Sequence, residues 1–83
     1  MTRIVLREIQ KNLNNYKEVK ELDIDSVENL CDLLNKDLED LLNYGVEQVS
    51  LMIDNTIKTV RDDKELEQMF NYNKTIRQTM KII

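Results

Sequence analysis

Histidine, proline, tryptophan and alanine are absent from this 83-residue sequence, and glycine and cysteine each occur once. Without histidine, the chain lacks the commonest general base at neutral pH and the commonest metal ligand. A single glycine cannot supply the glycine-rich loops that hold phosphates, nor the tight turn around a serine nucleophile. The sequence therefore predicts a protein that is not an enzyme and that binds no metal and no cofactor.

The single cysteine excludes a disulfide bond within the chain and suits a reducing compartment, so we expect a cytoplasmic protein. Cys31 is the only candidate nucleophile, but it falls on the apolar side of a predicted helix, where a thiol is packed and desolvated. We expect it in the core. The longest apolar runs span three residues, too few for a signal peptide or a membrane-spanning helix, so no membrane association is expected.

The length allows one domain, residues 1–83, because two cores of half this size would not be stable without disulfides or metals. Hydrophobic residues make up 41% and charged residues 34%, which predicts a folded chain rather than a disordered one. A core this small also favours stabilisation of the fold by a binding partner or by a second copy of the chain. The abundance of Asn, Lys and Ile is typical of AT-rich coding and suggests a small phage or mobile-element protein.

The clearest local pattern predicts one helix from Ser26 to Asn43. Its N-terminus would be capped by Asp25 together with Glu28, or by Ser26, and Gly45 would end it in a left-handed conformation. Apolar residues recur there at spacings of three and four, which places them on one side of the helix. This stripe consists of Val27, Leu30, Cys31, Leu34, Leu38, Leu41 and Leu42.

Residues 46–60 admit two interpretations. β-Branched residues and the alternation of Val49, Leu51 and Ile53 favour a hairpin that turns at residues 54–55. A helix competes, because Val46, Val49, Ile53, Ile57 and Val60 also lie three or four residues apart and only Leu51 departs from that spacing. Residue preference and short connections favour the hairpin.

The two ends of the chain are equally ambiguous. Residues 4–9 and 18–24 can form two strands, although Leu6, Ile9, Leu13 and Tyr16 also have helical spacing. A second helix is predicted to begin at Asp62, capped by Asp62 with Glu65, and to end at residues 71–73. The alternation over 74–83 then favours an edge strand, with a continuing helix as the alternative.

These elements predict an α+β fold: a small single domain with two helices and β-hairpins, arranged as two successive ββα-like units. The alternative is an all-α four-helix bundle, since helical spacing competes in residues 1–20 and 46–60. No linker or low-complexity segment marks a boundary.

Charge is distributed unevenly along the chain. Residues 1–20 carry five bases and two acids, whereas residues 21–45 carry one base and eight acids, a net charge of −7. Such a segment can be a solvated helix face that keeps the protein soluble, or a surface that attracts a basic partner. We therefore predict a non-enzymatic protein-binding module, such as an inhibitor or adaptor of a host protein. Its predicted binding residues are Glu28, Asp32, Glu39 and Asp40.

Two other functions remain open. One is a nucleotide or nucleic-acid binding regulator that uses the basic termini with Tyr16 and Tyr72, although a pI near 4.8 disfavours it. The other is a structural homo-oligomer that pairs through its tail. Met52, Met69 and Met80 can serve as adaptable contact residues, but core packing is the commoner role. The bases at the termini are Arg3, Arg7, Lys11, Lys17, Lys20, Lys74, Arg77 and Lys81.

Overall fold

The chain folds into five α-helices and one short 3-10 turn, and no strand occurs within residues 1–82. This computed structural model describes the backbone of residues 1–82 and the side chains of residues 1–80. The predicted α+β fold with two ββα-like units is therefore wrong, and the all-helical alternative is correct, with five helices in the described part rather than four. The elements are α1 (Arg3–Leu13), η1 (Val19–Glu21), α2 (Ile24–Leu34), α3 (Leu38–Asn43), α4 (Val46–Thr59) and α5 (Asp63–Ile82).

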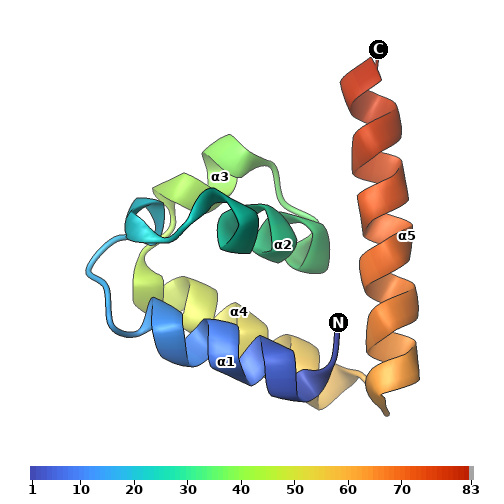
Figure 1. Cartoon of the computed structure of the whole chain (residues 1–83), viewed down its shortest axis with the longest axis horizontal. Helices are drawn as coiled ribbons and strands as arrows, with labels where there is room; N and C mark the ends of the chain where they lie inside the picture. Colours follow the sequence, from blue (N-terminus) through green and yellow to red (C-terminus); the bar gives the residue numbers. More distant parts are fainter. Residues whose placement is uncertain (83) are drawn as a thin grey trace.

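The helices form two packed groups. α1 lies against α4, and α2 packs on α4, α5 and α3, which in turn contacts η1 (Figure 1). α5 is the longest helix, and its C-terminal turns run past α2 and project from the rest of the molecule (Figure 1). Within the described residues no helix combines the length and the apolar content needed to span a bilayer.

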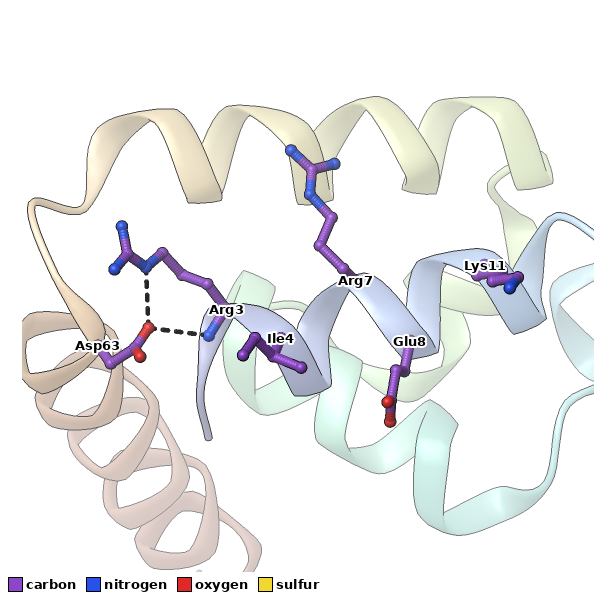
Figure 2. Close-up of a pocket in the computed structure, with 6 residues that line it drawn as sticks. All are labelled: Arg3, Ile4, Arg7, Glu8, Lys11 and Asp63. Atoms are coloured by element: carbon purple, nitrogen blue, oxygen red, sulfur yellow. Dashed lines mark hydrogen bonds and ion pairs between the residues drawn. The ribbon is translucent and has the colours of Figure 1, made fainter.

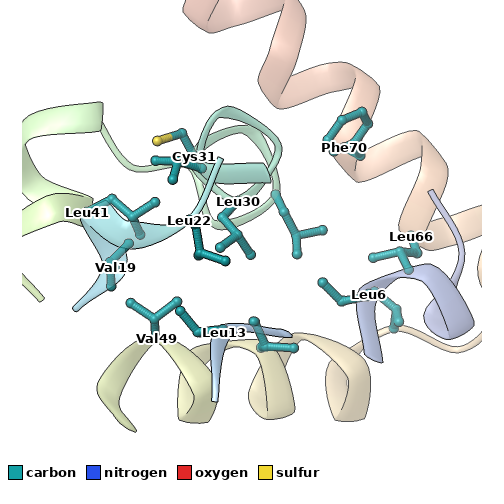
Figure 3. Packing of buried hydrophobic residues seen from close by; sticks show 14 residues of the cluster. Leu6, Leu13, Val19, Leu22, Leu30, Cys31, Leu41, Val49, Leu66 and Phe70 are labelled. Atoms are coloured by element: carbon teal, nitrogen blue, oxygen red, sulfur yellow. The ribbon is translucent and has the colours of Figure 1, made fainter. Parts of the chain in front are cut away.

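One hydrophobic core lies between the helices, and every element contributes to it (Figure 3). Complete burial of one such side chain stabilises the fold by about 1.5–3 kcal/mol. Cys31 is fully buried within this core, as predicted. The core consists of Leu6, Leu13, Val19, Leu22, Val27, Leu30, Cys31, Leu33, Leu41, Val49, Ile53, Val60, Leu66 and Phe70.

The segment predicted as a hairpin is α4. A strand would place Val49, Leu51 and Ile53 on one face, whereas Val49 and Ile53 are fully buried and Leu51 is 62% exposed. A helix with apolar residues three or four positions apart buries Val49 and Ile53 and leaves Leu51 exposed, as observed. Helical preferences among ordinary residues differ by at most about 0.7 kcal/mol each, less than the gain from burying one apolar side chain. Packing therefore decides the structure of this segment.

The N-terminal segment is also helical rather than a strand. The hydroxyl of Thr2 caps α1 by accepting a hydrogen bond from the Val5 backbone N–H at 3.2 Å. Leu6, Gln10 and Leu13 then lie on the buried side. The second predicted strand, residues 18–24, contains η1 instead, and its single β-type pairing is an isolated bridge between Glu18 and Gly45.

The predicted helix from Ser26 to Asn43 is two helices, because Asn35 adopts a left-handed conformation with φ of 54° between α2 and α3. Asn tolerates this conformation better than other residues with a side chain. The N-terminus of α2 is capped by Asp23, which accepts hydrogen bonds from the backbone N–H and the hydroxyl of Ser26. Gly45 has a φ of −73° and precedes α4, so its predicted role at a helix C-terminus is wrong.

The start of α5 was predicted correctly and its end was not. A carboxylate oxygen of Asp62 accepts the backbone N–H of Glu65 at 2.8 Å, which caps the helix. The helix then continues through residues 71–73 to Ile82, so the predicted edge strand over 74–83 is wrong as far as Ile82. Ile83 lies outside the described residues.

Candidate functional site

The four predicted binding residues do not share one helix face. Glu28 and Asp32 lie on α2, whereas Glu39 and Asp40 lie in the first turn of α3, beyond the break at Asn35. Three of these carboxylates are exposed, and Asp32 is buried. We call Glu28, Glu39 and Asp40 the acidic surface.

Asp32 holds α5 in place. Its carboxylate lies 2.5 Å from a guanidinium nitrogen of Arg77, and both side chains are about 12% exposed. Beside this pair, the Asn73 amide donates a hydrogen bond to the Leu33 carbonyl at 3.5 Å. A buried ion pair of this kind ties one helix to another, because removal of either partner leaves an uncompensated charge. Asp32 therefore does not belong to a surface that a macromolecule can reach.

Glu28 lies one turn before Asp32 and faces bases of its own chain. It lines a small cleft of about 120 Å³ between α2 and α5, together with Lys74, Arg77 and Gln78. The positive charge of Lys74 and Arg77 reduces the negative potential at Glu28. Glu28 is thus the weakest member of the acidic surface.

Glu39 and Asp40 have a different environment. They follow Asp37 at the start of α3, and residues 37–43 contain no base. Negative charge in the first turn favours the short helix through its dipole. Leu38 and Leu42 lie beside them and are 37% and 39% exposed, so their predicted place on a buried stripe is wrong. α3 therefore presents two partly exposed leucines next to carboxylates that form no ion pair among the described side chains, with Lys36 as the nearest base in the sequence.

The basic N-terminal helix is largely neutralised by the chain itself. Asp63 at the start of α5 accepts hydrogen bonds from the backbone and the side chain of Arg3 at 3.0 and 2.9 Å (Figure 2). These bonds hold the pKa of Asp63 below its ordinary value of 3.8. The amino group of Met1 contacts Glu67 in the same way and lowers the pKa of that carboxyl group. The N-terminus is thereby fastened to α5.

A second contact of this type joins α1 to α4. The Asp54 carboxylate accepts a hydrogen bond from Gln10 at 2.9 Å and pairs with Arg7 at 2.5 Å. Both contacts keep the pKa of Asp54 below 3.8, and the Gln10 bond contributes most. Arg3 and Arg7 border a shallow groove of about 550 Å³ on α1, with Ile4, Glu8, Lys11 and Asp63 (Figure 2). Few of its bases remain available for phosphate groups.

Tyr16 and Tyr72 are the aromatic residues predicted to stack on bases if the protein binds nucleic acid. Tyr16 lies in the segment between α1 and η1, whereas Tyr72 lies on α5, where it is 68% exposed. Arg77 pairs with Asp32, and the side chain of Lys81 lies outside the described residues. The two tyrosines therefore lie on different segments, and one of the C-terminal bases is held in an ion pair within the chain.

The acidic segment, residues 21–45, differs from the rest of the molecule in how many of its carboxylates form ion pairs. Outside it, five of the eight carboxylates form an ion pair among the described side chains: Glu18, Asp54, Asp63, Glu65 and Glu67. Within it, one of the eight does, namely Asp32. The carboxylates of the acidic segment are thus mostly left to solvent or to a partner.

The methionines lie closer to the surface than predicted. Met52 and Met69 are half-buried and line a groove of about 440 Å³ between α4, α5 and the C-terminal end of α2. Met80 is 68% exposed on α5, so core packing is wrong for this residue. Among the described residues, no three His, Cys, Asp or Glu side chains are grouped so that they could hold a metal ion.

Comparison with protein-family models, with curated proteins and with solved structures found no significant match for this chain.

Proposed function

We propose that the protein is a non-enzymatic binding module that uses its acidic surface to bind a basic surface on another protein. The observation that supports this proposal most directly is the contrast in ion pairing: carboxylates on α2, α4 and α5 pair with bases of other segments, whereas Glu39 and Asp40 form no ion pair among the described side chains. Unneutralised charge steers a partner of opposite charge during association.

The adjoining leucines make α3 a better binding element than charge alone. Leu38 and Leu42 supply partly exposed apolar area, and Glu39 and Asp40 border it with charge. An apolar centre with a polar rim is the usual composition of a protein interface. The composition of the chain favours a cytoplasmic inhibitor or adaptor of phage or mobile-element origin that acts on a host protein.

A charge-reversal experiment tests the proposal. The double variant Glu39→Lys with Asp40→Lys should lose capture of its partner from host lysate and weaken the purified complex by about tenfold or more, because attraction becomes repulsion. Glu8→Lys with Glu47→Lys is the matched control, since it changes net charge equally at exposed carboxylates on α1 and α4. Titration calorimetry with the isolated partner gives both affinities. The proposal is contradicted if both double variants lose affinity for the partner equally, or if neither variant loses affinity.

A further inference from the structure

α5 is held to the rest of the molecule in two different ways along its length. Its first half is anchored in the core by the buried side chains of Leu66 and Phe70. After Asn73, every described side chain except that of Arg77 is exposed, and the helix runs on past α2 (Figure 1). We call residues 74–80 the strap. Its attachment to α2 depends on polar contacts more than on apolar burial.

Arg77 is the residue that fastens the strap. One of its guanidinium nitrogens lies 2.5 Å from a carboxylate oxygen of Asp32, and both side chains are about 12% exposed. The guanidinium is satisfied incompletely, because Nε of Arg77 is buried and has no hydrogen-bond partner among the described residues. A donor that leaves water without gaining an acceptor disfavours the closed state. Opening returns both charges and this donor to water, which offsets part of the loss of the ion pair.

The sequence of the strap is poorly suited to an independent helix. Thr75, Ile76 and Thr79 are β-branched, and β-branched residues have lower helix propensity than unbranched ones. The hydroxyls of Thr75 and Thr79 donate hydrogen bonds at 2.9 Å to the carbonyl oxygens of Asn71 and Thr75, a contact that slightly destabilises helices. A strap released from α2 should therefore lose its helical structure, because a helix this short needs tertiary packing.

The strap covers carboxylates of the acidic segment. Glu28 and Asp32 lie one turn apart on α2, and we call them the α2 acid pair. Lys74 and Arg77 of the strap line the same cleft of about 120 Å³ as these two carboxylates. Glu28 is already exposed, whereas Asp32 becomes accessible only when Arg77 leaves it. Bases of the chain itself thus occupy the position that a basic partner would take.

We propose that the strap is an autoinhibitory segment, which opens to expose the α2 acid pair to a basic segment of a partner protein. In the closed state Arg77 occupies Asp32, so the strap and the partner compete for one carboxylate. Because the complete site forms only in the open state, the apparent affinity is reduced by the fraction of molecules that are open. This inference rests on the proposed function, because it identifies a regulated extension of the acidic surface from Glu28 to Asp32.

Amide hydrogen exchange tests the opening in the wild-type chain. The amides of residues 74–77 should exchange faster than those of residues 66–70 and at rates similar to those of residues 78–80, since the strap opens as one unit while the first half of α5 stays in the core. Ordinary fraying of the helix end would affect only the last turn. Protection of residues 74–77 equal to that of residues 66–70 overturns the inference.

A substitution at Arg77 tests what keeps the strap closed. Arg77→Ala should accelerate exchange of the strap amides by about tenfold or more, because the closed state would then bury Asp32 without a counter-charge. Lys64→Ala is the matched control, since it removes one exposed base from the first turn of the same helix and should leave strap exchange unchanged. Equal exchange of the strap in the two variants overturns the inference.

Binding of a hexa-arginine peptide tests the competition. Both variants are measured in a chain that also carries Glu39→Gln and Asp40→Asn, so that these two residues of α3 offer the peptide no charge. Arg77→Ala should bind the peptide about tenfold more tightly than Lys64→Ala, which has the same net charge. Adding Asp32→Asn to Arg77→Ala should remove this gain. Equal affinities of Arg77→Ala and Lys64→Ala in titration calorimetry overturn the inference.

Failure of this inference and failure of the proposed function give different results. If Arg77→Ala neither speeds exchange of the strap nor improves peptide binding, the strap is structural and binding through Glu39 and Asp40 is unaffected. If the strap opens as described but charge reversal at Glu39 and Asp40 leaves host-protein binding unchanged, the proposed function fails at α3 and the α2 acid pair is the basic-binding site.

Discussion

Charged side chains serve different purposes in two regions of this molecule. Around α1, α4 and the start of α5, carboxylates pair with bases from distant parts of the sequence, such as Arg3 with Asp63 and Arg7 with Asp54. On α3, Glu39 and Asp40 lie next to one another with no base on the helix. The first region uses charge to join helices, whereas the second leaves it available for association. Substitutions should therefore change stability in one region and binding in the other.

Asp32 provides the most demanding test of this contrast, because it lies in the acidic segment but joins α2 to α5 through its ion pair with Arg77. Asp32→Ala should lower the free energy of unfolding by about 3–5 kcal/mol, since it leaves the buried guanidinium of Arg77 without a counter-charge. Glu28→Ala, one turn earlier on the same helix, should cost less than about 0.5 kcal/mol because its side chain is exposed. Urea unfolding followed by circular dichroism measures both values.

The double variant Asp32→Leu with Arg77→Met keeps the test informative if Asp32→Ala does not fold. Replacing both members of a buried ion pair by apolar side chains is often neutral or stabilising, so this variant should unfold near the wild-type midpoint. Equal midpoints for Asp32→Ala and Glu28→Ala would show that the contact between α2 and α5 does not depend on this charge.

Acid should weaken the paired region. The pKa values of Asp54 and Asp63 are held below 3.8 and that of Glu67 below 4.5, in each case chiefly by hydrogen bonds from Gln10, Arg3 and the terminal amino group respectively. The unfolded chain therefore binds protons before the folded one does as pH falls. The stabilisation is complete above the ordinary values and is lost as pH decreases through the lowered ones.

Urea midpoints at neutral pH and below these ordinary values measure this loss. Asp54→Asn should reduce the difference between the two conditions, because it removes one of the carboxyl groups whose pKa depends on folding. A wild-type midpoint that is the same in both conditions contradicts the assignment of these contacts to the folded state.

One local signal identified the start of a helix correctly, whereas the predicted left-handed helix cap at Gly45 and the predicted helix end at residues 71–73 were wrong. Asp62 with Glu65 marked the start of α5, since a capping contact spans only three residues and depends on little else. Val49 and Ile53 were assigned to a strand because their β-branched shape was given more weight than their spacing. The exposure of Leu51 shows that the spacing carried the decisive information.

The separation of the acidic residues could not be predicted from their spacing. A continuous apolar stripe from Val27 to Leu42 concealed the break at Asn35, because Asn is compatible with both a helix interior and a left-handed turn. The pairing of Asp32 with Arg77 spans 45 residues, and no local pattern indicates it. Charge counts found the acidic segment, but only packing shows which of its carboxylates are buried.

The smallest expected effect concerns the stability contributed by α3. Glu39→Gln with Asp40→Asn should lower the free energy of unfolding by no more than about 0.3–1 kcal/mol per residue, since these charges interact with the helix dipole at an exposed site. The same variant should weaken partner binding clearly, as the charge reversal does. Urea unfolding and calorimetry on one preparation give the two quantities together. A large loss of stability with unchanged binding would assign both carboxylates to the fold, and α3 would then belong with the paired region.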